Sequence, residues 1–568
     1  MGDSGGLRGH AEDYTLLWGL VLVVGVLSVL PLARLLLEGI APNGDLSGQA
    51  FARILSSRTT WTATGHSLIT ALGGTVLAVA IGGAVALVVS LTDIRGRNAF
   101  VFCFVLPMMI AAQVIALAWL QLFGPSSPLL KLIGLAPALG SRNPLYSAGG
   151  IIVVLGVQYA PLIFLTLRAG LRTLPRELIE AALAGGARPV TALRTIVLPL
   201  MTPPLVAGIA LSFVSCLGNF GIPALLGIPA NYLVLPTLIY QRLAGLGPGV
   251  LSEVSVLSML VGCIAIVGIL LQDVMLRRRD FRISTTSSVA RPFELGRWRL
   301  PVEIGLWSLS VMVLVLPLIA LILTSLVPSV GVPLSARTAT LANYEFVLFG
   351  HDAARRALVN SFALSATAAI AIPLIAVPLA YFLVWRRSRA LRIVNLVTEM
   401  PYALPGVVLA IAAILLFLKP LPLLGFSIYN TVWIILFCYL ARFLVLGLRP
   451  VISGYYQIDR TLEEASQIAG ARLFRRLRSI IFPLLAPVAS AGALLIFLTA
   501  FNELTVSALL WSSGAETLGV IFFSFAQGGD SNYAAALGTL TVVVTTALML
   551  STLFMAGRLP PGVLPWRD

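Results

Sequence analysis

Long apolar runs dominate the sequence and constrain its fold more than any other feature. A helix that spans a bilayer needs roughly 20 mostly apolar residues, and the 568-residue chain contains twelve such runs with short polar segments between them. Only 11% of the residues are charged, against about 25% in an ordinary soluble domain. The sequence therefore predicts an all-α membrane protein with about 12 transmembrane helices, and it excludes a soluble globular enzyme.

The runs fall into two sets of six, which predicts two tandem six-helix halves. The stretch between the sets, from Arg277 to Arg299, is rich in Arg, Ser and Thr and has no apolar period, so we interpret it as a linker outside the bilayer. We place the first half at 1–285 and the second at 286–568, and we expect each to pack as its own unit. The runs lie near residues 14–37, 66–91, 99–123, 149–168, 200–222, 251–275, 302–327, 357–384, 393–418, 428–448, 484–510 and 532–556.

The net charge of +15 comes almost entirely from arginine, because Lys131 and Lys419 are the only lysines. With the N-terminus placed in the cytoplasm, most of these arginines fall in cytoplasmic segments, as the positive-inside rule requires. We therefore interpret them as topological anchors in contact with a lipid bilayer, with no nucleic acid as partner. The first apolar run is too long for the core of a signal peptide, and we expect it to be retained.

An internal repeat relates the two halves. The stretch Glu177–Leu226 aligns without gaps to Thr461–Leu510 at a shift of 284 residues, with 19 of the 50 positions identical. Earlier in each half, Pro107 matches Pro401 at a shift of 294. Since each half has an even number of spans, the two copies have the same orientation, and an axis along the membrane normal should relate them.

The best-matched part of the repeat is polar and lies on the predicted cytoplasmic side, in loops near 172–198 and 456–482. Its copies are "PRELIEAALAGGARPVTALRTIVLPL" and "DRTLEEASQIAGARLFRRLRSIIFPL", and both contain Glu-Ala-(Ala/Ser)-x3-Gly. Pro175 and Asp459 favour a helix start, and Gly186 and Gly470 favour a helix end. Each loop is thus predicted to hold a short helix with small residues along one face.

Small residues on one helix face allow the surface of another protein to approach the backbone closely. Two equivalent helices on one chain imply a partner with two equivalent sockets, such as a twofold-symmetric dimer. The simpler alternative is that each segment packs under its own helical bundle. The residues expected to contact the partner are Glu180, Ala181, Ala182, Gly186, Glu464, Ala465, Ser466 and Gly470.

These duplicated loops resemble the "EAA" loops in the permease subunits of binding-protein-dependent ABC importers of the type I fold, where they form coupling helices. The fused arrangement, with "NFGIPALLGIPANYLVLPTLIY" and "EMPYALPGVVLAIAAILLF", is similar to the iron(III) permeases of that family. One departure is Ser466, where the motif has its second alanine. The resemblance implies a bacterial inner-membrane importer that works with two copies of an ABC ATPase subunit and an external substrate-binding protein.

The chain lacks the residues that would let it hydrolyse ATP itself. A P-loop needs Gly-Lys-(Ser/Thr), and neither Lys131 nor Lys419 follows a glycine. We therefore expect no enzyme activity in this chain, with ATP and Mg²⁺ bound by the partner subunit. The cysteines and histidines form no metal-ligand spacing, so we expect no metal site and no bound cofactor.

Polar side chains inside the apolar runs are candidates for a transport pathway or gate, because charges in a bilayer are costly and tend to face the bundle interior. Counting residues from the helix ends predicts similar depths for Glu399 and Arg442, and hence an ion pair. Structural hydrogen bonds between helices are the equally weighted alternative. The repeat places Gln158 and Asn219 at the positions of Arg442 and Glu503. The candidates are Glu399, Arg442, Glu503, Asn219, Asn502 and Gln158.

Two other classes of protein are compatible with parts of this pattern. An ion-gradient-driven secondary transporter would have the same topology but no need for the duplicated loops or for an ATPase. A membrane-embedded enzyme would need convergent catalytic groups, which the sequence does not offer. Within the ABC importers, thiamine, phosphonate and polyamine are substrates that the sequence leaves open beside iron(III).

Overall fold

The computed structural model describes residues 4–42, 48–138, 140–245, 247, 249–277, 293–386, 388–420 and 425–555. Within these residues the chain forms helices, with one isolated bridge between Thr92 and Phe293 and no strand. In the described part of the chain, nine helices are long and apolar enough to cross a membrane, and the total is twelve when each of three bent helix pairs is counted as one span. The predicted all-α architecture with about 12 spans is confirmed, and each span overlaps one of the predicted runs.

The described part of the first half contains fifteen α-helices, because several of its six spans are interrupted and short helices such as α9 and α13 lie between spans. Its first span runs from α1 through one π-helical turn into α2. The last described residue of the half is Arg277, so the predicted boundary at 285 lies outside the described residues. The helices are α1 (Ser4–Val24), α2 (Leu30–Ile40), α3 (Gln49–Ser56), α4 (Arg58–Leu91), α5 (Arg97–Met109), α6 (Ala112–Phe123), α7 (Pro128–Leu132), α8 (Ala148–Arg172), α9 (Arg176–Ala184), α10 (Pro189–Ala192), α11 (Leu198–Leu200), α12 (Thr202–Gly218), α13 (Gly221–Leu226), α14 (Leu235–Ala244) and α15 (Val250–Arg277).

The second half repeats this order. A short helix precedes its fifth span, as α9 does in the first half, and two short helices separate its fifth and sixth spans. The helices are α16 (Arg299–Ser310), α17 (Leu316–Ser325), α18 (Ala342–Glu345), α19 (Asp352–Tyr381), α20 (Arg389–Ala403), α21 (Gly406–Phe417), α22 (Val432–Tyr455), α23 (Arg460–Ile468), α24 (Leu473–Arg476), α25 (Phe482–Phe501), α26 (Ser507–Leu510), α27 (Leu518–Gly528) and α28 (Ser531–Met555).

The third span of each half is broken at the same place in the repeat. Helices α5 and α6 meet at 101°, and α20 and α21 meet at 106°. The backbone is extended at Ile110 and at Leu404, just after the matched prolines Pro107 and Pro401. Because hydrocarbon offers no hydrogen-bonding partners, the peptide groups freed at such breaks must be satisfied by other parts of the protein.

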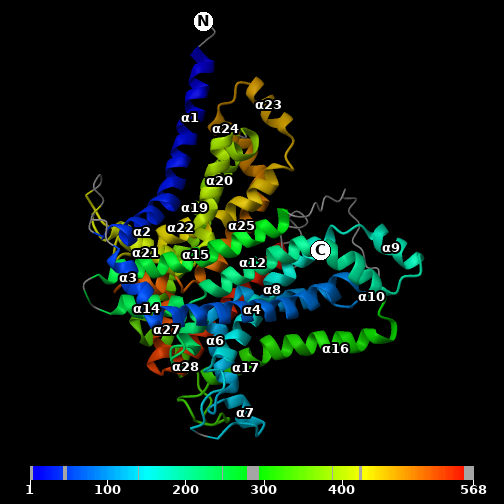
Figure 1. The fold of residues 1–568 in the computed structure, drawn as a ribbon, viewed down its shortest axis with the longest axis vertical. Coiled ribbons are helices and arrows are strands. Elements are labelled where there is room, and N and C mark those ends of the chain that lie inside the picture. The colour runs from blue at the N-terminus through cyan, green and yellow to red at the C-terminus, as the bar shows by residue number, and fades with distance from the viewer. Residues whose placement is uncertain are drawn as a thin grey trace.

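The halves exchange their first helices, as Figure 1 shows from the position of α1 and α2 beside α20 and α21. Helix α2 of the first half contacts α21, and α1 contacts α19, α20 and α24. In the other direction, α17 of the second half contacts α6. The two halves are therefore not independent units as the linker suggested, because each completes its bundle with a helix from the other.

Within the first half, α4 and α8 pack closely because glycines remove side chains from their contact. A Cβ added at Gly82 would overlap the carbonyl of Ala160, whereas a Cβ at the neighbouring Gly83 would lie 3.7 Å from Leu167. Small residues at helix crossings allow backbones to approach in a membrane, where packing rather than water exclusion drives helix association.

Substituting these adjacent glycines should affect stability differently. We expect Gly82→Ala to destabilise the fold by about 2 kcal/mol, because α4 and α8 must separate. Gly83→Ala is the matched control and should be neutral or stabilising by up to about 1 kcal/mol, since alanine favours helix. Thermal unfolding of both variants in detergent measures the difference. Equal stabilities would contradict the close packing of α4 on α8.

Candidate functional site

The duplicated loops form the short helices that the sequence predicts. Helix α9 starts after Pro175, and α23 starts after Asp459, whose carboxylate accepts a hydrogen bond from the backbone N–H of Thr461 at 3.0 Å. This bond to the charged form lowers the pKa of Asp459. Both helices end at glycines with left-handed backbones, Gly186 at φ 84° and Gly470 at φ 78°. The expected starts and ends are confirmed.

Most of the residues expected to contact a partner lie open on these helices. Glu180, Ala181, Gly186 and their counterparts Glu464, Ala465 and Gly470 are exposed, and Ala182 is half-buried. Glu464 already forms an exposed ion pair with Arg460 at 3.2 Å. Ser466 differs from the expectation, because it is buried and its hydroxyl donates to the Glu463 carbonyl at 2.7 Å. This serine therefore faces the bundle rather than a partner.

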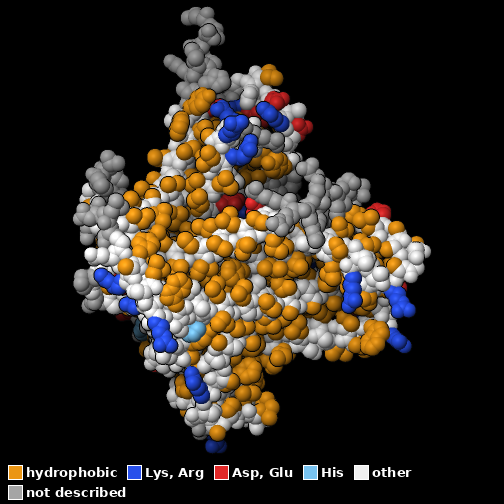
Figure 2. Space-filling model, viewed as in Figure 1, with side chains coloured by type: hydrophobic (Ala, Val, Ile, Leu, Met, Phe, Trp, Pro, Cys, Tyr) orange, Lys and Arg blue, Asp and Glu red, His pale blue; other side chains and the backbone are white. Residues whose placement is uncertain are grey.

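Large apolar side chains are also exposed around both loop helices, and sequence reasoning missed most of them. Ile468 and Phe474 near α23 are 89% and 72% exposed, and Leu178 and Val190 near α9 are 44% and 59% exposed. Figure 2 shows charged side chains gathered around the two tips that carry α23 and α9, beyond the broad apolar belt of the spans. Exposed apolar side chains within such polar surroundings are typical of a protein-binding surface.

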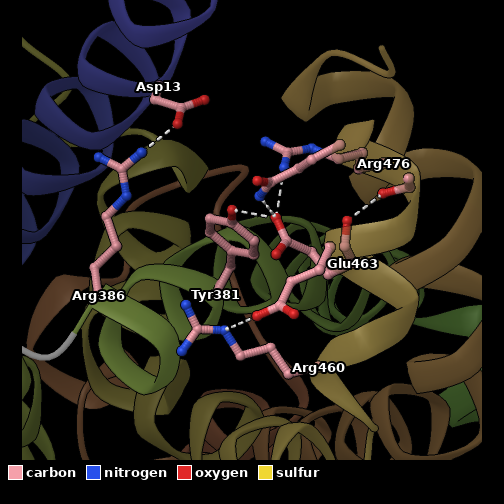
Figure 3. A network of polar contacts seen from close by, with 9 residues as sticks. Asp13, Tyr381, Arg386, Arg460, Glu463 and Arg476 are labelled. Carbon is pink, nitrogen blue, oxygen red and sulfur yellow. Dashed lines mark hydrogen bonds and ion pairs between the residues drawn. The ribbon is translucent and has the colours of Figure 1, made fainter. Parts of the chain in front are cut away.

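The loop helix α23 also contains a buried charged residue, Glu463, that α9 lacks. Glu463 is paired with Arg476 of α24, and it accepts a hydrogen bond from the Tyr381 hydroxyl at 2.9 Å (Figure 3). The side chains of Glu463 and Arg476 are 5% and 7% exposed. Sequence reasoning passed over Glu463 because the adjacent Glu464 fits the repeated motif.

The predicted ion pair between Glu399 and Arg442 is wrong. Glu399 pairs with Arg449 at 3.2 Å, whereas Arg442 lies 3.6 Å from Glu503. The apolar run near 428–448 suggested a helix end at 448, but α22 continues to Tyr455. Arg442 therefore lies seven residues, or about 10 Å at roughly 1.5 Å per residue, away from the level of Arg449 and Glu399.

In the first half, two of the candidate residues stabilise irregular backbone. The Gln158 side-chain amide donates to the carbonyls of Pro107 and Ile110 at 3.1 and 3.4 Å, at the break between α5 and α6. Asn219 accepts a hydrogen bond from the N–H of Ile222 at the start of α13 and donates to the Tyr159 hydroxyl at 2.9 Å. The amides thus supply the partners that a broken span in hydrocarbon requires.

The second half uses charged residues at the matched positions. Glu503 accepts hydrogen bonds from the N–H groups of Val506 and Ser507 at 2.8 and 3.2 Å, and so caps α26 as Asn219 caps α13. Arg442 lies against Gly406 at the break between α20 and α21, where any Cβ would overlap its guanidinium. Glycine at 406 therefore makes room for the arginine, and the expected polar match with asymmetric charge is found.

The two halves meet at these breaks. The Asn502 side chain, from the second half, donates to the Met109 carbonyl of the first half at 3.1 Å. At the matched position of the first half, Gly218 lies against Pro405, and an added Cβ would be 3.1 Å from the proline ring. Five of the six candidate pathway residues thus belong to the two breaks and the turns after the fifth spans. Glu399 is apart from them.

The described residues at this centre offer hydrogen bonding and charge pairing. Among the described residues no group of three or more His, Cys, Asp or Glu side chains could hold a metal ion. The breaks place carbonyls, amides and one arginine–glutamate pair at the contact of the two halves. Such a junction can change shape by exchanging hydrogen bonds between its two sides, which suits a gate.

A repeated bundle of up to twelve spans with two exposed loop helices defines a multi-pass membrane protein. Comparison with known proteins agrees, since residues 74–285 and 372–565 each match the family described as binding-protein-dependent transport system inner membrane component. The chain belongs to this family and is an ABC transporter permease subunit. Its family implies an ATPase subunit and a substrate-binding protein as partners.

Individual relatives match across both halves. The chain is 27% identical over 483 residues to the probable ABC transporter permease protein y4fN of Sinorhizobium fredii, covering 83% of each protein. It is 25% identical to the ferric transport system permease protein FbpB of Actinobacillus pleuropneumoniae, over 81% of this chain and 66% of that relative. For the Fe(3+)-transport system permease protein FbpB 2 of Haemophilus influenzae the identity is 24%, over 68% and 72%.

Replacing the charged pair by the residues of the other half separates a structural role from a transport role. Arg442→Gln alone leaves Glu503 without its cation and should destabilise the fold by about 3 kcal/mol. Arg442→Gln combined with Glu503→Asn recreates the arrangement of Gln158 and Asn219, and we expect it to recover most of that loss.

Thermal unfolding in detergent measures the recovery, and solute uptake in proteoliposomes measures transport. A stable double variant with reduced uptake would assign the charges to the pathway, and one with full uptake would assign them to structure. A double variant no more stable than Arg442→Gln alone would contradict the structural equivalence of the two sites.

Proposed function

We propose that this chain is the membrane subunit through which two copies of an ABC ATPase drive the import of iron(III) across a bacterial inner membrane. The observation that carries the proposal is the pair of loop helices. They are equivalent in the repeat, they lie at separate tips, and both present small and apolar residues to the surroundings (Figures 1 and 2). A partner with two equivalent sockets fits this arrangement.

The ATPase belongs to a separate subunit in this proposal. Neither lysine of the chain follows a glycine, so the chain has no P-loop lysine for ATP phosphates. ATP and Mg²⁺ are then bound by the partner, and this chain binds no cofactor. The arginine distribution favours a cytoplasmic N-terminus, which puts α9 and α23 on the cytoplasmic side, where ATP is available.

Closure of the two ATPases would draw α9 and α23 together and move the spans that follow each helix. The fifth spans end at Gly218 and Phe501, directly before the turns that touch the breaks of the opposite half. Movement of the loop helices would therefore reach the central junction through α12 and α25. Opening that junction toward the outside would let a substrate-binding protein deliver its solute.

Iron(III) is the substrate that the relatives favour, because ferric permeases match both halves of the chain. Ferric iron is a hard cation that prefers oxygen ligands. The described residues contain no cluster of metal-ligating side chains, so we place recognition of iron in the external binding protein. The permease would then provide passage and coupling rather than a high-affinity site.

Docking of the ATPase is tested at the most exposed apolar residues. We expect Ile468→Ser combined with Phe474→Ala to weaken ATPase binding by about tenfold or more, since apolar anchors dominate the binding energy of interfaces. Phe349→Ala is the control, because Phe349 is 75% exposed but precedes α19, at the end of that helix remote from Tyr381.

Co-purification of the ATPase from detergent extracts measures the effect. Unchanged binding in the Ile468 and Phe474 variant would contradict the docking surface. Uptake that proceeds with no ATPase bound would instead support an ion-gradient-driven transporter.

The substrate is tested by uptake in cells that lack this chain. We expect accumulation of radiolabelled ferric iron to fall and to recover when the full chain is supplied, because this chain provides the spans of the proposed importer. Uptake of thiamine, a phosphonate and a polyamine should stay unchanged. Normal iron uptake together with loss of one of these other solutes would assign the permease to that solute.

A further inference from the structure

At positions that match in the repeat, the two halves place different kinds of side chain beneath their loop helices. Under α23, a cluster of Tyr381, Glu463 and Arg476 is buried between three helices, and we call it the anchor cluster (Figure 3). Arg476 and the Tyr381 hydroxyl both bind the Glu463 carboxylate, and Gln467 donates to the same oxygen. One carboxylate on α23 is therefore held by donors from α19, from α24 and from α23 itself.

The anchor cluster continues into the membrane-spanning part of the second half. The Tyr381 ring packs edge-on against Trp385 at 5.2 Å, and Trp385 packs edge-on against Tyr455 at 5.1 Å. The Tyr455 hydroxyl donates to the Val377 carbonyl of α19 at 2.9 Å. These contacts join the ends of α19 and α22, so a displacement of Glu463 acts on two spans at once.

The first half also reaches this region through its exchanged first helix. Arg386, which follows α19, forms an ion pair with Asp13 of α1 (Figure 3). Its guanidinium also lies over the Tyr14 ring. Helix α1 contacts α24 and α19 directly. The loop helix of the second half is thereby connected to spans of both halves.

The residues at the matched positions of the first half are nonpolar. At the shift of 284 residues, Ile179 occupies the place of Glu463 and Ala192 that of Arg476, and both are fully buried. At the shift of 294 that relates the earlier spans, Leu87 takes the place of Tyr381. Nonpolar contacts are non-directional and tolerate sliding, whereas charged hydrogen bonds fix the distance and the orientation of their partners.

We propose that Tyr381, Glu463 and Arg476 are positioning residues that lock α23 to the spans, so that the second loop helix transmits ATPase motion more rigidly than the first. This inference rests on the proposed function, because it assumes that ATPases move both helices. Motion is then transmitted asymmetrically, because α23 is held by the anchor cluster, whereas the first half has nonpolar side chains at the matched positions.

The experiment transfers the residues of the first half into the second. In the complete transporter in proteoliposomes, Glu463→Ile combined with Arg476→Ala replaces the anchor cluster by the buried pair found under α9. We expect the number of ATP molecules hydrolysed per solute imported to rise about threefold to tenfold, the factor that corresponds to the loss of an ordinary hydrogen bond from the coupled state. The maximal ATPase rate should be retained.

A purely structural role would lower uptake and ATP hydrolysis by the same factor, because it would reduce the number of assembled complexes. A variant with the ratio of the unmodified transporter would therefore overturn the proposal. Tyr381→Phe is the second variant, since it removes a single hydroxyl and keeps the ion pair, and it should raise the ratio by a smaller factor. If the double variant does not assemble, the number of ATP molecules hydrolysed per solute in Tyr381→Phe tests the proposal.

The first loop helix provides the matched control. Ile179→Val shortens the buried side chain under α9 and should leave the ratio unchanged, because no directional contact is lost. An equal rise in this variant would overturn the asymmetry. The variant with Ile468→Ser and Phe474→Ala separates the two proposals. If that variant binds the ATPase normally, the docking of α23 is refuted. If it binds the ATPase less tightly but the anchor-cluster variants keep the unmodified number of ATP molecules per solute, only the present inference is refuted.

Discussion

The need to satisfy backbone polar groups inside a bilayer determines the centre of this protein. Both halves interrupt their third span, and each interruption exposes carbonyl groups where no water is available. At the break of the first half, the partners come from the fourth span of the same half and from the turn after the fifth span of the other half. Gln158 donates to a carbonyl of its own half, whereas Asn502 donates to a carbonyl of the other half.

That requirement also explains why polar residues occur at matched positions in the repeat. Asn219 and Glu503 each cap a short helix that follows a fifth span, so the backbone needs an acceptor there whichever residue supplies it. The acceptor can therefore be a different residue in each half. In the second half it is the Glu503 carboxylate, which lies beside Arg442, so the two halves share a backbone arrangement but differ in charge.

The sequence was sufficient to predict the spans, the repeat and the two loop helices, because these depend on local composition and on caps. It could not give the side-chain pairs, since these depend on where helices end. The end of α22 at Tyr455 rather than near Leu448 changed the partner of Arg442 from Glu399 to Glu503. The motif likewise directed attention to Glu464, although its buried neighbour Glu463 forms the contacts inside the protein.

The exchange of first helices has a consequence for how the chain is made. Helix α2 leaves the ribosome long before α21, the helix that it finally contacts, so it must wait in the lipid with part of its surface unoccupied. Its Arg34 pairs with Glu38 one turn away, and it donates to the Leu415 carbonyl of α21 only in the complete protein. The Arg34–Glu38 pair neutralises both charges during this interval. Helix α2 can therefore stay in the lipid bilayer until the second half of the chain has been synthesised and inserted.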